Sequence, residues 1–263
     1  MPLRKVVLWS VDEDDPRAPP QVVWDGMSAA KRAHVVDSLP RELPATEACP
    51  PEGDVHYEAV ARTRSSLRGH FRRLRRRIYV GNGLPVYYPA EAMFSPDLLA
   101  VLDVEDRTRN SWVVSAEGKG LDLALEIHWL GHRLKDVQRN VVRYAALGIG
   151  EYFVCDLRRL VLRGYRLVES GAASYEPVVP QGGRLSSMAL GLELALEGDR
   201  LRFYHGLAAL PDADELIARL DAGVAAAKER AESEAQRAED AERRLAEALA
   251  RIEQLEAELS GKR

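Results

Sequence analysis

Two acidic residues, Asp97 and Glu126, are the strongest candidates for chemistry in this sequence of 263 residues. Asp97 follows Pro96 directly before an apolar run, and Glu126 lies 29 residues later inside a second apolar run. This separation leaves room for two neighbouring strands and their connection. Two carboxylates on paired strands can share one Mg²⁺ ion, with Mn²⁺ as the alternative, because such ions prefer oxygen ligands and keep several waters. A bound ion of this kind activates water and stabilises charge on a phosphate, so the pair predicts a metal site for phosphodiester hydrolysis.

A basic group near the two acids would complete such a site. His128 lies two residues after Glu126 and therefore on the same strand face, where a histidine can act as a base or as a cation. Lys135, directly before Asp136 at the start of a predicted helix, is the nearest lysine. The candidate catalytic residues are therefore Asp97, Glu126, His128 and Lys135, with the two acids as metal ligands.

Each of these residues also has a plainer interpretation. Asp97 can cap a turn at the entrance of its strand, and His128 can be a histidine of the core or of the sheet edge. Asp136 has the position of a first-turn acid that the helix dipole favours. Glu126 is harder to explain in this way, because an acid inside a central strand is costly to bury without a partner.

Apolar strands and one helix must position these side chains. Residues 98–104 form a strongly apolar run, and residues 121–129 alternate between apolar and polar side chains, so both ranges predict strands. An amphipathic helix follows from about Leu134 and ends at Gly148. Residues 152–155 return as a buried strand, which gives a strand–helix–strand unit whose two strands should be parallel.

A second helix, predicted over residues 57–78, is strongly basic. It carries Arg62, Arg64, Arg68, Arg72, Arg73, Arg75, Arg76 and Arg77, with no acid after Glu58. Such a field can bind phosphates, so we expect nucleic acid, with DNA as the first choice, to contact Arg68, Arg72, Arg73, Arg75 and Arg76. A solvated basic helix and a helix paired with the acidic tail are the alternatives. No base-reading motif is visible, so sequence specificity is not predicted.

Three regions follow one another along the chain. Residues 1–54 are rich in proline and predict an irregular arm with one short helix around residues 29–39. Residues 55–210 hold the predicted strands and helices, and within them residues 160–205 contain short strands that extend the sheet or form an antiparallel flap. Residues 211–263 predict one long helix with a heptad pattern, which favours a homodimer through a coiled coil. A solvated single helix stabilised by charge pairs is the alternative for this tail.

Composition limits the class of protein. The charged fraction is 30% and the hydrophobic fraction is 46%, as expected for an ordinary globular protein. The two cysteines, Cys49 and Cys155, show no spacing typical of a disulfide or a zinc site, and Cys155 lies in an apolar run. No segment resembles a signal peptide, and none approaches the roughly 18 apolar residues of a membrane span. We therefore expect a cytoplasmic protein that does not enter the membrane.

The order of these motifs resembles that of a known family. Pro96-Asp97, the strand with Glu126, Lys135-Asp136, Tyr144 and the segment 147–153 occur in the order of the Uma-two-type endonucleases, within the PD-(D/E)XK restriction-endonuclease-like superfamily. The resemblance spans about residues 56–205, and some members carry a similar alanine- and glutamate-rich tail. It implies an α/β fold with a mixed sheet flanked by helices, followed here by the long C-terminal helix. It also implies that Asp97 and Glu126 bind the metal.

This chain departs from the family pattern at three positions. Asn140 stands where members carry a helix lysine, Trp129 where most carry a serine, and His128 where the wider superfamily has a lysine. The leading hypothesis is an Mg²⁺-dependent endonuclease. The alternative is a nuclease fold without catalysis that serves as a nucleic-acid-binding or protein-interaction module.

Overall fold

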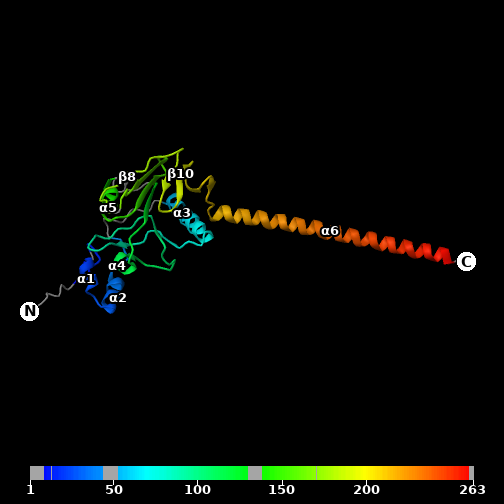
Figure 1. The fold of residues 1–263 in the computed structure, drawn as a ribbon, viewed down its shortest axis with the longest axis horizontal. Helices are drawn as coiled ribbons and strands as arrows, with labels where there is room; N and C mark the ends of the chain where they lie inside the picture. The colour runs from blue at the N-terminus through cyan, green and yellow to red at the C-terminus, as the bar shows by residue number, and fades with distance from the viewer. Residues whose placement is uncertain (1–8, 13, 44–52, 130–137, 170, 261–263) are drawn as a thin grey trace, which may run out of the picture. The chain divides into compact units, whose positions relative to one another are not determined.

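A computed structural model describes residues 9–12, 14–43, 53–129, 138–169 and 171–260 (Figure 1). Contacts divide the chain into two units, Met1–Asp212 and Ala213–Arg263, which are described separately below. Lys135, Asp136 and Cys49 lie outside the described residues, so the predictions made for them stay predictions.

The first unit is organised around a six-stranded mixed sheet with the strand order β1-β3-β5-β6-β7-β8. Its strands are β1 (Ile78–Gly81), β3 (Leu98–Leu102), β5 (Leu123–His128), β6 (Glu151–Asp156), β7 (Val161–Arg166) and β8 (Glu176–Pro177). β5 and β6 are parallel, and the other neighbours are antiparallel. The predicted mixed sheet and the predicted parallel pair are both confirmed.

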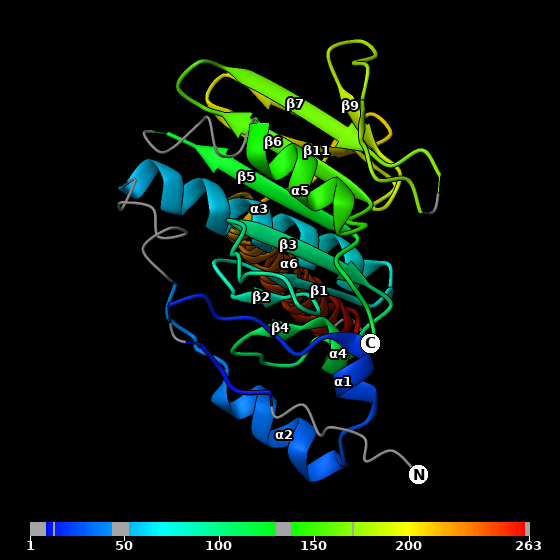
Figure 2. The same cartoon turned by 90° about the vertical axis from the view of Figure 1, so that its left-hand side faces the viewer.

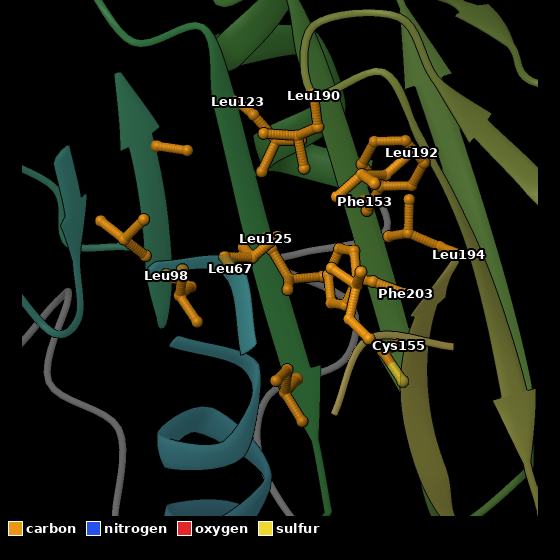
Figure 3. Close-up of a cluster of buried hydrophobic side chains, with 14 of the residues drawn as sticks. Leu67, Leu98, Leu123, Leu125, Phe153, Cys155, Leu190, Leu192, Leu194 and Phe203 are labelled. Carbon is orange, nitrogen blue, oxygen red and sulfur yellow. The ribbon is translucent and has the colours of Figure 1, made fainter. Parts of the chain in front are cut away.

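One face of this sheet packs against the basic helix and a second sheet. Helix α3 (Asp54–Arg73) contributes Leu67 to this core (Figure 3), and it also contributes Phe71. The second sheet is antiparallel and consists of β9 (Leu185–Ser187), β10 (Leu192–Glu197), β11 (Arg200–His205) and β12 (Ala208–Ala209). Cys155 is fully buried between these layers, and burial raises the pKa of its thiol to about 12, as expected for a structural cysteine.

The opposite face of the sheet packs against helix α5 (Asn140–Ala146), so α3 and α5 cover different faces (Figure 2). Strands β2 (Val86–Tyr87) and β4 (Trp112–Val113) form a small parallel pair on this side, and the short helix α4 (Val114–Glu117) follows β4. Gly148 has φ 73°, and the N–H of Ile149 donates to the carbonyl of Tyr144. This left-handed glycine cap ends α5 where the sequence predicts.

The proline-rich N-terminal segment contains two helices in its described part, α1 (Gln21–Asp25) and α2 (Ala29–Ser38). The hydroxyl of Ser28 accepts a hydrogen bond from the N–H of Lys31 and so caps α2. Trp24 and Val35 are buried together with Tyr87, which places this segment against β2 and β4. A domain boundary at residue 54 remains our prediction.

The predicted bounds of the basic helix are wrong at its C-terminal end. We expected a helix over residues 57–78, but α3 ends at Arg73, and Ile78 begins β1. Arg75 adopts a left-handed backbone with φ 54°, and the N–H of Arg76 donates to the carbonyl of Phe71. This cap normally selects glycine, so no residue at this position signals the end of the helix. Strand β3 likewise ends at Leu102, two residues early, because Asp103 has φ 58°.

The second unit consists of one helix, α6 (Ala213–Ser260), as the long proline-free tail predicts. Apolar side chains on α6 are exposed, among them Ile217, Val224, Leu245, Leu249 and Ile252. No described helix in the chain combines the length and the apolar character needed to cross a membrane.

Candidate functional site

Asp97 and Glu126 lie side by side, as the sequence predicts for residues on neighbouring strands. β3 and β5 are antiparallel, with Leu98 opposite Leu125, so the residue before β3 faces Glu126. The backbone N–H of Asp97 donates to Oε2 of Glu126 at 3.0 Å, and the N–H of Ile127 donates to Oδ2 of Asp97 at 2.7 Å. Each carboxylate is therefore held by the backbone of the strand that carries the other.

Glu126 is almost completely buried, with 6% of its surface exposed. Its second oxygen, Oε1, accepts hydrogen bonds from the hydroxyl of Tyr144 at 3.2 Å and from Nδ2 of Asn140 at 3.4 Å. Both donors come from α5. A buried carboxylate is stable only when such donors replace the water that it loses. The helix that follows β5 therefore fixes the orientation of Glu126.

Tyr144 is itself held in place by other aromatic rings. Its ring centroid lies 4.9 Å from that of Phe94 and 5.0 Å from that of Tyr152, and the ring is buried. These contacts restrict the tyrosine hydroxyl to one position. Tyr144 is thus both a packing residue, as its apolar surroundings suggest, and a donor to Glu126.

His56 joins the site from the first turn of α3. Its Nε2 lies 3.2 Å from Oδ2 of Asp97, and both side chains are partly exposed. Gly53, with φ 80°, turns the chain directly before the helix that carries this histidine. Sequence reasoning missed His56, because nothing in its spacing from Asp97 indicates that the start of α3 meets the start of β3.

Of the two basic candidates, the structure describes His128 but not Lys135. His128 is buried at the end of β5 on the same strand face as Glu126, and it pairs in register with Asp156 of β6. Its backbone carbonyl accepts from the N–H of Leu157 at 2.9 Å. Lys135 lies outside the described residues. Asn140, which the sequence marks only as a departure from the family pattern, is in direct contact with Glu126.

The arginines of α3 line a groove of about 670 Å³ together with residues that follow the helix. Arg68, Arg72, Arg75 and Arg76 of the predicted set contribute to its walls, whereas Arg73 does not. Arg68 forms an ion pair with Asp106 at 2.6 Å. Tyr57 also lines the groove, and it follows His56, the residue that contacts Asp97, in the first turn of α3.

No cluster of three His, Cys, Asp or Glu side chains is placed to hold a metal ion among the residues that the structure describes. Mg²⁺ commonly uses only one or two carboxylates and completes its coordination with waters and substrate phosphates. The donor set of Asp97 and Glu126, two hard carboxylates side by side, is of this kind.

Comparison with known proteins identifies the family. A family model described as "Uma2: Putative restriction endonuclease" matches residues 45–197, which include Asp97, Glu126, α3 and α5. The chain belongs to this family. The resemblance seen in the sequence is confirmed, and so is the mixed α/β fold with a long C-terminal helix. The match ends before α6, so the tail lies outside the family's shared region.

A solved structure is similar over part of the chain. It is described as a "putative nuclease belonging to DUF820" from Anabaena variabilis, with 13% sequence identity and a TM-score of 0.42. The similarity covers 54% of this chain and 76% of that one. No curated protein matches this sequence.

The contact between Tyr144 and Glu126 is open to a direct test. We expect Tyr144→Phe to lower the free energy of unfolding by about 1–2 kcal/mol, because the charged acceptor loses a donor. In a Glu126→Gln background the same change should cost clearly less, since the acceptor is no longer charged. Urea unfolding followed by tryptophan fluorescence measures both values.

Tyr87→Phe is the matched control, because its hydroxyl donates to the carbonyl of Pro40 and not to Glu126. Its cost should be the same in both backgrounds. Equal costs for Tyr144→Phe in the two backgrounds would contradict the interaction.

Proposed function

We propose that this protein is a metal-dependent endonuclease that hydrolyses phosphodiester bonds of nucleic acid, with DNA as the expected substrate. One observation carries the proposal: Asp97 and Glu126 lie together at the start of β3 and in the middle of β5, each bonded to the backbone of the other's strand. Membership of a family described as restriction endonucleases supports the same class of reaction.

Asp97 and Glu126 would hold the metal, with Mg²⁺ expected and Mn²⁺ as the alternative. The side chain of Asp97 is 27% exposed, so a solvated ion and a phosphate have access to it. When bound, the ion supplies an activated water and stabilisation of the charge on the phosphate. Glu126 stays oriented because Tyr144 and Asn140 bond to its other oxygen.

The basic residues near the two acids would have separate roles in the reaction. His56 lies against Asp97 and would keep that carboxylate turned toward the substrate side. His128, on the strand face of Glu126, is the candidate to assist the attacking water, and Lys135 is the alternative. The arginines of α3 would contact the phosphate backbone, which is the usual origin of non-specific affinity for nucleic acid.

We also propose that α6 joins two chains into a homodimer, acting in the cytoplasm. Heptad positions on α6 carry exposed Leu245, Leu249 and Ile252, and burying such a seam against a second copy would stabilise the pair. A dimer suits an enzyme that cuts both strands of a duplex, because each strand then has its own site.

A second function has one observation in its favour. Asn140 occupies the position where the family resemblance implies a lysine, and its neutral amide contacts Glu126 directly. Without an ammonium group at this place, the transition state loses one source of charge stabilisation. The protein would then be a nucleic-acid-binding or protein-interaction module on a nuclease fold.

Cleavage assays test the leading proposal. We expect the wild-type chain to cut plasmid or single-stranded DNA with Mg²⁺ or Mn²⁺, and chelation to stop the reaction. Asp97→Asn and Glu126→Gln should each lower the rate by about 100-fold or more, because the loss of a metal ligand costs several kcal/mol of transition-state stabilisation. Agarose gels and labelled oligonucleotides measure the rates.

Asp103→Asn is the control for this assay, since Asp103 is an exposed acid at the other end of β3. It should cut at the wild-type rate. A folded wild-type chain that cuts nothing with either metal would refute the nuclease and favour the binding module.

The variant Asn140→Lys tests the second function, in which the nuclease fold has no catalytic activity. The new ammonium would lie near Glu126, so we expect it to raise the cleavage rate at least about 10-fold. Asn140→Met has a side chain of similar length without charge and should give no increase. Equal rates for the two variants would show that charge at this position is not what limits the reaction.

Sedimentation equilibrium tests the dimer. We expect the full chain to be a dimer, and Leu245→Glu together with Leu249→Glu to shift it toward the monomer, because two charges would then enter the seam. Ala250→Glu lies outside the heptad positions and should leave the dimer intact. A wild-type chain that stays monomeric would exclude self-association and leave a different partner for the tail.

A further inference from the structure

We propose that the groove beside α3 binds a single strand of nucleic acid, with a base stacked on Tyr57 and the phosphates on the arginines. This inference rests on the proposed function and narrows its substrate to an unpaired strand.

Tyr57 presents its ring to solvent. It is 72% exposed, whereas the other tyrosines of the chain, all of them in described regions, are buried or half-buried. The ring lines the mouth of the groove. Single-stranded nucleic acid is commonly bound by such aromatic rings inside cationic grooves, because every base has a face that can stack.

The lining of the groove also favours a single strand. Val60 and Ile78 are buried in the core, so the exposed apolar surface of its lining comes from Tyr57 and Ala61, and Arg72 and Arg77 provide charge. A duplex keeps its bases stacked inside and presents phosphates outward, so it would leave the apolar surface without a partner. An unpaired strand can turn its bases onto this surface while its phosphates face the arginines.

The charge of the groove is available to a ligand. Its acid, Asp106, is already paired with Arg68. In the part of the chain that the structure describes, Arg72, Arg75 and Arg77 form no ion pair, and all three are exposed. Several arginines without acidic partners around one groove attract a polyanion, and this attraction weakens with salt.

The first turn of α3 links the groove to the candidate site. Tyr57 is the neighbour of His56, whose Nε2 lies 3.2 Å from Oδ2 of Asp97. A base stacked on Tyr57 would therefore lie one residue along α3 from the histidine that contacts Asp97. Stacking at this point would fix the register of the strand and present one phosphodiester bond to Asp97 and Glu126.

Binding assays in the presence of a metal chelator test the inference, because the proposed cleavage needs the metal and cannot interfere. Fluorescence anisotropy would compare a labelled single strand of about 12 nucleotides with the duplex of the same sequence, both against the full chain. We expect the single strand to bind more tightly. Tyr57→Ala should weaken single-strand binding by about 10-fold, and Tyr57→Phe should retain it, because stacking needs the ring and not the hydroxyl.

Two further variants separate stacking from charge. Arg77→Ala should weaken the binding of both the single strand and the duplex, and it should reduce the dependence of affinity on salt. Leu74→Ala removes an exposed apolar side chain that follows α3 but does not line the groove, and it should change nothing. Circular dichroism confirms that each variant is folded.

Three results would overturn the inference: duplex bound as tightly as the single strand, Tyr57→Ala without effect, or Tyr57→Phe as weak as Tyr57→Ala. The experiment distinguishes failure of this inference from failure of the proposed nuclease function. Single-strand binding that depends on Tyr57, in a chain that cuts nothing, would leave this inference standing and refute the catalytic proposal alone.

Discussion

The burial of the Glu126 carboxylate is the constraint on which the rest of the site depends. An acid in the middle of a central strand is costly unless donors surround it. Here they come from two elements: the backbone N–H of Asp97 at the start of β3, and the side chains of Tyr144 and Asn140 on α5. The pairing of β3 with β5 and the packing of α5 are therefore required for the fold as well as for the site. The hydrogen bonds that stabilise the buried Glu126 would also orient it for the proposed chemistry.

The two faces of the central sheet contribute different parts of the candidate site. The face covered by α5 holds Glu126 through buried aromatic and polar contacts, which makes that half of the site rigid. The other half is supplied by the first turn of α3, where His56 and Tyr57 are next to each other in the sequence. One of them contacts Asp97, and the other lines the basic groove. Helix α3 thus connects the groove that would bind the strand with the acids that would cut it.

Much of this arrangement follows from local sequence. Alternation identifies β5, the apolar run identifies β3, and Gly148 marks the end of α5 because only a left-handed residue completes that cap. Other features depend on long-range contacts that spacing does not encode. Arg75 adopts a backbone normally reserved for glycine, so the end of α3 carries no signal. His56 meets Asp97 only because α3 packs across the sheet.

The proposed binding and the proposed catalysis would depend on different residues. Affinity for a strand would depend on exposed arginines and Tyr57, which make no contact with Glu126 among the interactions of the described residues. Catalysis would depend on charge at Asp97, Glu126 and their basic partner. Under the proposed function, Asn140 at the position of a family lysine would slow the reaction and leave binding in the groove unchanged, because the amide still donates to Glu126 and preserves the fold. The residue at position 140 would thus affect the proposed chemistry without being required for the proposed binding of nucleic acid.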